Sequence, residues 1–226
     1  FFGYLNQRHA HNYYTDYLWR NTEKVTLNNK VKYTGKFGSA ATERNEYSND
    51  LFRDEALKFV EENKDNSFFL YLAYTIPHAN NESWLVKKHG MEVPHLGIYK
   101  DKDWPEPQKA HAAMITRLDT YMGQLDKKLN QLGIAENTLV IFTSDNGPHA
   151  EGGAKPGFFD SNGPLNGIKR WMTDGGIRVP MIAKWPGKIK PDTITDQPSA
   201  FWDFLPTACQ LANVTPPENI DGISFL

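Results

Sequence analysis

Two oxygen-bearing side chains stand side by side in a glycine-rich loop that follows an apolar run. Asp145 and Asn146 come shortly after residues 139–142 and open the stretch DNGPHAEGG. Carboxylate and amide oxygens suit Ca²⁺ or Mg²⁺ rather than zinc. Two ligands do not complete a calcium site, which needs six to eight oxygens, and Asp-Asn-Gly is also common where an Asx turn closes a strand. The spacing alone leaves a metal site and a turn open.

A histidine and two cations occupy other loops. His78 follows Pro77 at the end of the apolar run 67–75. A histidine beside a leaving oxygen can donate a proton. Lys169 and Arg170 lie in a loop with Asn and Gly, and such cations bind the oxygens of sulfate or phosphate esters. A packed or exposed histidine and solvated charges are the alternatives, so these residues indicate an anion or metal site without naming the reaction.

The first 47 residues are rich in aromatic and polar side chains and have no clear period. Arg8, His9 and His11 are interleaved with aromatic residues, namely Tyr4, Tyr13, Tyr14, Tyr17 and Trp19. Aromatic faces stack on sugar rings, and polar side chains bind sugar hydroxyls. The segment is therefore either a sugar-binding surface or an aromatic loop packed on the domain.

Alternating helices and short apolar strands are expected to position these loops. The pattern predicts helices over 50–63, 108–132 and 199–212 and strands over 67–75, 138–144 and 179–185. Such alternation favours an α/β fold whose mostly parallel sheet has helices on both faces. Ligands of such sheets bind beyond the carboxyl ends of the strands. We therefore expect His78, Asp145, Asn146 and Lys169 to converge at one edge.

Composition excludes several classes of protein. The net charge of −2 offers no electrostatic surface for nucleic acid or an anionic membrane, and no apolar run reaches the length of a membrane span. The lone Cys209 excludes an intrachain disulfide, and its apolar surroundings predict a buried structural thiol. The chain begins at Phe1 without an initiator methionine and ends in an apolar segment, so we expect a piece of a longer protein.

Four stretches together resemble the type I sulfatases of the alkaline phosphatase superfamily, the arylsulfatase-A-like enzymes. They are FFLYLAYTIPHAN, LVIFTSDNGPHAEGG, NGPLNGIKRWMTDGGIRVPMIAKWPGKI and FWDFLPTACQLANVTPPENIDGISFL. The second and third are highly specific in combination. The resemblance implies an alkaline-phosphatase-like α/β fold with a mostly parallel sheet, truncated at both ends. Residues 1–226 would then be a partial sulfatase catalytic domain.

The resemblance also implies the chemistry, which is hydrolysis of sulfate esters by a formylglycine nucleophile with the help of one calcium ion. Asp145 and Asn146 match two of the calcium ligands. His78 matches the histidine that contacts the ester oxygen, and Lys169 matches the lysine that binds sulfate. The further substrate-binding candidates are His149, Arg170, Arg8, His9 and His11.

Other parts of the family pattern are absent from the chain. The C/S-x-P-x-R motif that yields formylglycine, the Asp-Asp calcium ligands and the Lys-x-His segment lie near the amino terminus of these enzymes. We expect them upstream and expect this chain alone to be inactive. Cys209 precedes Gln-Leu-Ala and does not match the modified cysteine. Asp174 stands where Glu is commoner, and Asn166 replaces an Arg of many relatives, which is expected to alter how substrate is held.

The stretches GYLNQRHAHNYYTDYLWRN and GPHAEGG resemble bacterial sulfatases that desulfate marine or host glycans. This resemblance implies a sulfated sugar or polysaccharide as substrate and a periplasmic or secreted location. Two alternatives stay open: a phosphodiesterase or phosphonate monoester hydrolase of the same superfamily, and a non-catalytic glycan-binding homologue. The upstream nucleophile motif would distinguish all three.

Overall fold

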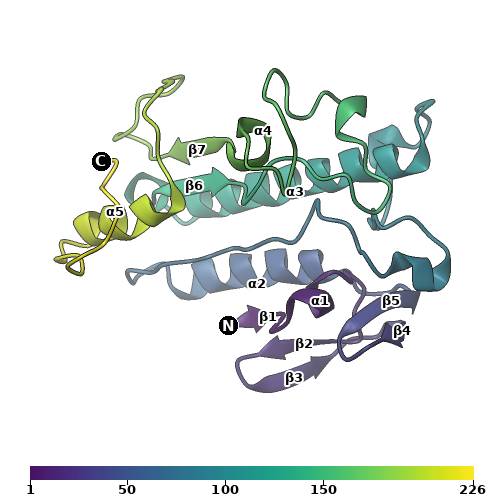
Figure 1. Ribbon diagram of the computed structural model, residues 1–226. Helices are drawn as coiled ribbons and strands as arrows, with labels where there is room; N and C mark the ends of the chain where they lie inside the picture. Colours follow the sequence, from purple (N-terminus) through teal and green to yellow (C-terminus); the bar gives the residue numbers. More distant parts are fainter. The chain divides into compact units, whose positions relative to one another are not determined.

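The computed structural model describes all 226 residues of the chain. The chain divides into two compact units, Phe1–Lys188 and Ile189–Leu226. The first unit contains all the strands and the helices α1 to α4 (Figure 1). It also contains every site residue predicted from the sequence. No helix of the chain has the length and apolar character needed to cross a membrane.

Small antiparallel sheets form the amino-terminal region. β1 (Phe2–Gly3), β2 (Tyr17–Arg20) and β3 (Glu23–Thr26) pair in that order, and β4 (Lys30–Thr34) pairs with β5 (Gly38–Glu43). The one-turn helix α1 (Gln7–Ala10) begins after Asn6, whose side chain accepts hydrogen bonds from the amides of Arg8 and His9. This N-cap satisfies amides that have no partner within the helix.

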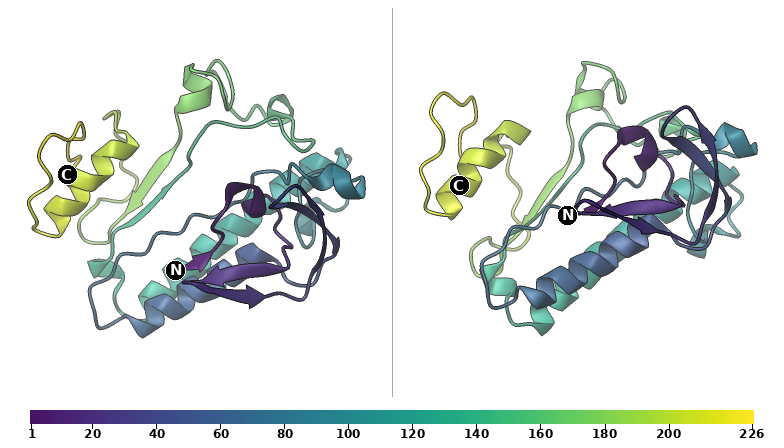
Figure 2. Two further views of the ribbon diagram at one scale, coloured as in Figure 1. Left: turned by 60° about the horizontal axis from the view of Figure 1, so that its bottom comes forward. Right: turned by 90° about the horizontal axis from the view of Figure 1, so that it is seen from below.

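Two long helices form the centre of the first unit. α2 (Ser48–Glu62) and α3 (Glu106–Gln131) lie side by side in all views (Figure 2). Their apolar faces meet in a cluster that includes Val60, Leu125 and Leu129. Gly133, with φ of +70°, follows the end of α3, where a left-handed residue is favoured. The predictions of helices over 50–63 and 108–132 are confirmed within two residues at each end.

Residues 67–75, predicted as a buried strand, belong to no strand and no β-ladder. Their side chains alternate: Phe68, Leu70 and Leu72 pack against the cluster between the two helices, whereas Tyr71 is exposed. This is the period of two expected for an extended segment with one covered face. The prediction of a buried strand was wrong for this chain, because no other segment supplies a pairing backbone and only one face is covered.

The remaining strands form one antiparallel pair. β6 (Val140–Thr143) pairs with β7 (Met181–Lys184), and Thr143 lies opposite Met181. Both strands were predicted. Every ladder of the chain is antiparallel, so the mostly parallel sheet is not formed among these residues. The loops that carry the site contain short helical turns: η1 (Ser83–Val86), η2 (Gly97–Tyr99), η3 (Ala135–Asn137), η4 (Pro156–Phe158) and α4 (Asp174–Ile177).

The second unit consists of η5 (Phe201–Asp203), α5 (Phe204–Leu211) and loops. Its hydrogen bonding centres on Asp203, whose carboxylate accepts from the amides of Ala200, at 2.8 Å, and Ile223, at 3.0 Å. The helix predicted over 199–212 is confirmed in a shorter form. Cys209 is free but only half-buried, so the prediction of a buried thiol is corrected.

Candidate active site

His78 and Lys169, 91 residues apart in the chain, are in direct contact. Lys169 Nζ lies 2.8 Å from His78 Nε2. The other ring nitrogen, Nδ1, lies 2.7 Å from the carbonyl oxygen of Ala79. A carbonyl can only accept, so Nδ1 carries the proton of the neutral ring and Nε2 accepts from the lysine. Nε2 is therefore the nitrogen whose lone pair lies on the side of Lys169 and Glu151.

Glu151, which the sequence did not single out, joins the two. One of its carboxylate oxygens, Oε2, lies 3.1 Å from His78 Nε2 and 3.4 Å from Lys169 Nζ, and the other accepts from Arg170. The Glu151 side chain is only 17% exposed. Burial acts to raise the pKa of Glu151, but Lys169, His78 and Arg170 outweigh it and hold that pKa below its usual range. Glu151 thus stays ionised among the cations.

The surroundings of His78 favour its neutral form. Burial lowers the pKa of His78, and the nearby Lys169 lowers it further. The hydrogen bond to Ala79 and the charge of Glu151 act in the opposite direction but do not restore the usual pKa. To donate a proton from Nε2, His78 must first gain one. The carboxylate 3.1 Å away is the group that would stabilise the resulting imidazolium.

The rings of four histidines form a column through the site, in which each ring contacts the next. His11 stacks on His78 with centroids 5.3 Å apart, His78 on His149 at 5.4 Å, and His149 contacts His111 at 5.7 Å. Burial lowers the pKa of His149, and it lowers the pKa of His111 to about 4. Burial therefore favours the neutral form of His78, His149 and His111, and neutral rings can pack without mutual repulsion.

His149 connects two loops rather than facing solvent. Its Nε2 donates to the carbonyl of Pro77 at 3.1 Å, and its Nδ1 accepts from the amide of Glu151 at 3.1 Å. The residue is buried. The prediction of His149 as a substrate contact is therefore corrected: both ring nitrogens are used within the chain, and the residue positions His78 and Glu151.

The amino-terminal segment reaches the same site through Glu82. His11 Nδ1 lies 2.9 Å and Arg8 Nε 3.3 Å from the carboxylate of Glu82. Arg8 stays half-exposed, so both it and His11 remain substrate-binding candidates. His9 does not, and its prediction was wrong. It faces the interior of the turn, where it stacks on Tyr17 and bonds to Thr15, and it is fully buried.

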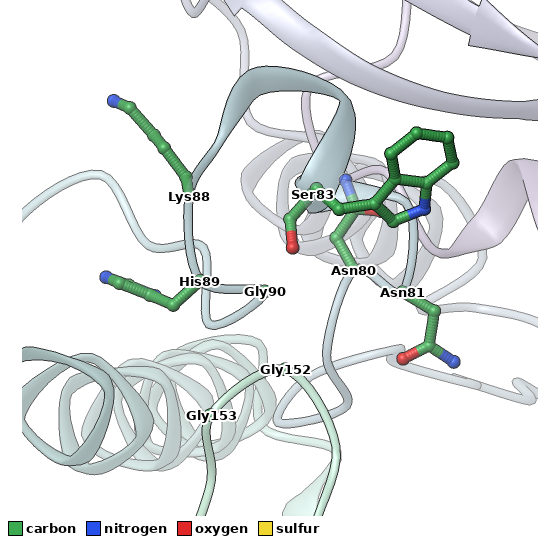
Figure 3. A pocket seen from close by; sticks show the side chains of 9 residues that line it. Asn80, Asn81, Ser83, Lys88, His89, Gly90, Gly152 and Gly153 are labelled. Atoms are coloured by element: carbon green, nitrogen blue, oxygen red, sulfur yellow. The ribbon is translucent and has the colours of Figure 1, made fainter.

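Close backbone packing holds the Glu151 loop against the His78 loop. Asn80 N–H donates to the carbonyl of Gly90 at 2.8 Å, and Gly90 N–H donates to that of Gly152 at 2.8 Å. Figure 3 shows these three residues around one pocket. A Cβ on Gly152 would lie 2.4 Å from the Cβ of Ala79, and its φ is +59°. Only glycine allows this approach at this position.

Asp145 and Asn146 lie in the loop after β6, as predicted. This loop is tied to the Lys169 segment, because Lys169 N–H donates to the carbonyl of Pro148 at 2.9 Å. The Asp145 carboxylate is exposed and has no hydrogen bond or ion pair, and Asn146 donates through Nδ2 to Gly147, which leaves Oδ1 without a donor. The unpaired oxygens of these two side chains fit part of the shell of a hard cation. No group of three or more His, Cys, Asp or Glu residues completes it.

Comparisons with known proteins agree on one family. A family model described as Sulfatase matches residues 2–214. Human steryl-sulfatase is 33% identical over 172 residues, which cover 74% of this chain and 27% of that protein. Rat N-acetylgalactosamine-6-sulfatase is 33% identical over 180 residues, which cover 78% of this chain and 31% of that protein. The chain thus spans about three tenths of the length of these curated relatives.

Solved structures give the same result. Ps i-CgsB superposes with a TM-score of 0.67 at 29% identity, over 81% of this chain and 38% of that one. Its complex with k-i-k-neocarrahexaose superposes with a TM-score of 0.63 at 30% identity over the same shares. A protein of glycosaminoglycan metabolism in Bacteroides thetaiotaomicron, at 21% identity and a TM-score of 0.59, supports the fold alone. The predicted α/β fold of the alkaline-phosphatase-like sulfatases is confirmed by its similarity to these solved structures.

Proposed function

The chain belongs to the sulfatase family, and from this premise we propose that the protein carrying it hydrolyses sulfate esters of a sulfated carbohydrate. One observation supports the proposal most strongly: Lys169, His78 and Glu151 form a compact cluster in which a cation, a proton carrier and a carboxylate lie within 3.4 Å of one another. Residues 1–226 are proposed to be part of the catalytic domain.

Each member of the cluster has a separate task in the proposal. Lys169 binds the sulfate oxygens and neutralises their charge, as a charge-assisted donor does best in a partly buried site. His78 protonates the oxygen of the departing sugar from Nε2. Glu151 positions both side chains and stabilises the protonated ring. Arg170, paired with Glu151 and largely exposed, supplies a second cation at the rim.

Members of the family generally use a formylglycine nucleophile and a metal ion. In this chain Asp145 and Asn146 would hold the metal, a calcium ion in our proposal, through their unpaired oxygens. The ion, when bound, supplies electrostatic stabilisation of the negative charge on the sulfate. The formylglycine and the remaining ligands are proposed to lie outside these 226 residues. Within the chain, the loop contact between Lys169 and Pro148 keeps the lysine beside the metal loop.

A sulfated glycan is the substrate class that the relatives favour. Ps i-CgsB was solved with a neocarrahexaose, and a curated relative is named for sulfated N-acetylgalactosamine. The exposed Arg8 and the half-buried His11, one ring away from His78, extend the site toward a sugar. An enzyme encounters polymeric sulfated glycans outside the cytoplasm, so the proposal includes a periplasmic or secreted location in a bacterium.

Sulfate release by the full-length protein that carries this chain tests the proposal. Sulfated sugars and the matching phosphate esters are offered to the wild type and to Lys169→Ala. We expect release of sulfate in preference to phosphate and a strong loss in the variant. Lys128→Ala, which removes only an ion pair with Glu61 between α3 and α2, is the matched control and should retain activity. Preferred hydrolysis of phosphate esters, or no hydrolysis at all, would contradict the proposal.

A further inference from the structure

The pocket between the His78 and Glu151 loops lies beside the cluster of His78, Lys169 and Glu151. It encloses about 290 Å³ and is lined by Asn81, Trp84 and Lys88 among others, with Gly90 and Gly152 in its wall (Figure 3). Pockets for small ligands range from about 300 to 1,000 Å³. This one stands at the lower limit, so it offers room for a single ring rather than for a whole oligosaccharide.

Several polar side chains around this pocket have no partner within the chain, whereas Asn80 in its wall is paired with Ser39, Glu82 and Glu92. The Asn81 amide, the Trp84 indole N–H and the Lys88 ammonium form no hydrogen bond or ion pair. His89 Nδ1 is buried and also lacks a partner. In the adjoining cluster, by contrast, Lys169, His78 and Glu151 are mutually paired. Of the unpaired groups only the His89 nitrogen is buried, and buried polar groups without a partner are rare in folded proteins. The three other side chains are exposed, so a ligand can reach them without breaking a contact within the chain.

The pocket and the cluster share two stretches of chain. Asn80, in the pocket wall, comes two residues after His78, and Gly152, in the opposite wall, directly follows Glu151. Successive Cα atoms lie about 3.8 Å apart, so the walls lie within about 8 Å of the Cα atoms of the two cluster residues. A sugar held at the cluster would therefore lie close enough for a linked neighbour to reach the pocket.

The chemistry of the pocket combines an aromatic face, an amide and positive charge. Trp84 is 63% exposed and contacts no other aromatic ring, so its face is open for stacking. Lys88 is exposed next to His89, and in Figure 3 both side chains extend on the side opposite Asn81. Aromatic faces and amides bind sugar rings and hydroxyls, and a free ammonium binds an anionic oxygen.

We propose that this pocket is a carbohydrate subsite for the sugar next to the one that carries the cleaved sulfate, and that it favours a neighbour bearing an anionic group. Trp84 stacks on the ring of that neighbour, Asn81 bonds to its hydroxyls, and Lys88 with His89 contacts its sulfate or carboxylate. The inference rests on the proposed sulfatase function, and it adds a length and charge preference to it.

The test compares substrates of two lengths in the full-length protein that carries this chain. Trp84→Ala is expected to raise KM about tenfold for a sulfated trisaccharide, since one aromatic contact is lost, and to leave KM for the sulfated monosaccharide unchanged. Trp202→Ala removes an equally exposed tryptophan from the second unit and serves as the control. An equal effect of Trp84→Ala on both substrates, or no effect on either, would overturn the subsite.

A second variant tests the charge preference. Lys88→Ala should weaken the binding of trisaccharides whose neighbouring sugar carries a sulfate or a carboxylate. It should leave the binding of trisaccharides with a neutral neighbour unchanged. Comparing the sulfated and carboxylated trisaccharides shows which anion the pocket prefers. Lys58→Ala, on the exposed face of α2, is the control. Equal weakening for charged and neutral neighbours would refute the charge preference.

Failure of the proposed function can be separated from failure of the subsite. If the wild type cleaves no sulfate ester, calorimetric binding of the sulfated trisaccharide still tests the pocket. Binding that is weakened by Trp84→Ala but not by Trp202→Ala would support a glycan site without sulfatase activity. Equal binding by the wild type and Trp84→Ala would overturn the subsite.

Discussion

The substitution Gly152→Ala examines how the Glu151 loop is held against the His78 loop. At φ of +59° a residue with a Cβ costs about 1–2 kcal/mol. The added methyl would also lie 2.4 Å from the Cβ of Ala79 and 2.9 Å from the Cα of Gly90. Overpacking of this kind costs about 1–3 kcal/mol. We therefore expect a loss of about 2–5 kcal/mol in the free energy of unfolding.

The same substitution should also reduce activity, because the backbone that must move is joined directly to Glu151. A shift of the carboxylate lengthens its contacts of 3.1 Å to His78 and 3.4 Å to Lys169. Misplacement by about 1 Å at a reacting group costs on the order of a hundredfold in rate. Sulfate release, measured well below the unfolding midpoint, therefore reports on the geometry of the cluster rather than on the folded fraction.

Substitutions of two other glycines separate the cost of backbone strain from the cost of the close contact with Ala79. Gly163 has φ of +49° with no atom within 4 Å of an added Cβ, so Gly163→Ala carries the backbone cost alone, about 1–2 kcal/mol. Gly157 has neither a positive φ nor a close neighbour, so Gly157→Ala should change stability by less than about 0.5 kcal/mol. Urea unfolding of the three variants gives the comparison. If Gly152→Ala costs no more than Gly163→Ala, the packing against Ala79 does not contribute to the loss and the reasoning is refuted.

Two further predictions concern charge and metal. The charge of Glu151 raises the pKa of His78, so Glu151→Gln should lower the pKa of His78 further. If activity needs protonated His78, activity falls as pH rises through that pKa. The decline in the pH–rate profile of the variant should therefore begin at lower pH. An unchanged decline would show that His78 is not the group that titrates. The isolated chain should bind calcium weakly or not at all in calorimetry, because Asp145 and Asn146 supply only part of the shell; micromolar affinity would mean that other residues here complete it.

The sequence predicted the elements whose cause is local. The apolar residues of α2 and α3 recur at helical spacing, and Gly133 marks the end of α3, so both helices were found nearly to their limits. Residues 67–75 have the apolar composition of a strand. Strand formation also needs a second backbone segment that pairs with these residues, and composition does not encode that segment. The antiparallel pairing of β6 with β7 is likewise a contact between distant segments.

The site was predicted in part for the same reason. His78 and Lys169 stand in loops after apolar runs and match family motifs, and these signals led to both. Glu151 has no such signal, because a single acid in a glycine-rich loop is ordinary in a turn; only its contacts with Lys169, Arg170 and His78 distinguish it. His9 stands in the same aromatic and polar stretch as Arg8 and His11, so the sequence does not distinguish the three. Only the orientation of the one-turn helix α1 makes His9 buried and leaves the other two accessible.

The most direct measurement of the central claim varies the leaving group in the full-length protein carrying His78→Ala. Sugar sulfates release a poor alkoxide that needs a proton, whereas nitrophenyl sulfate releases a stable phenolate that needs little help. If His78 protonates the departing oxygen from Nε2, the variant should lose about a hundredfold or more in kcat on the sugar sulfate and far less on nitrophenyl sulfate. Equal losses on both substrates would contradict the account, since they would make His78 a sulfate-binding residue rather than the proton donor.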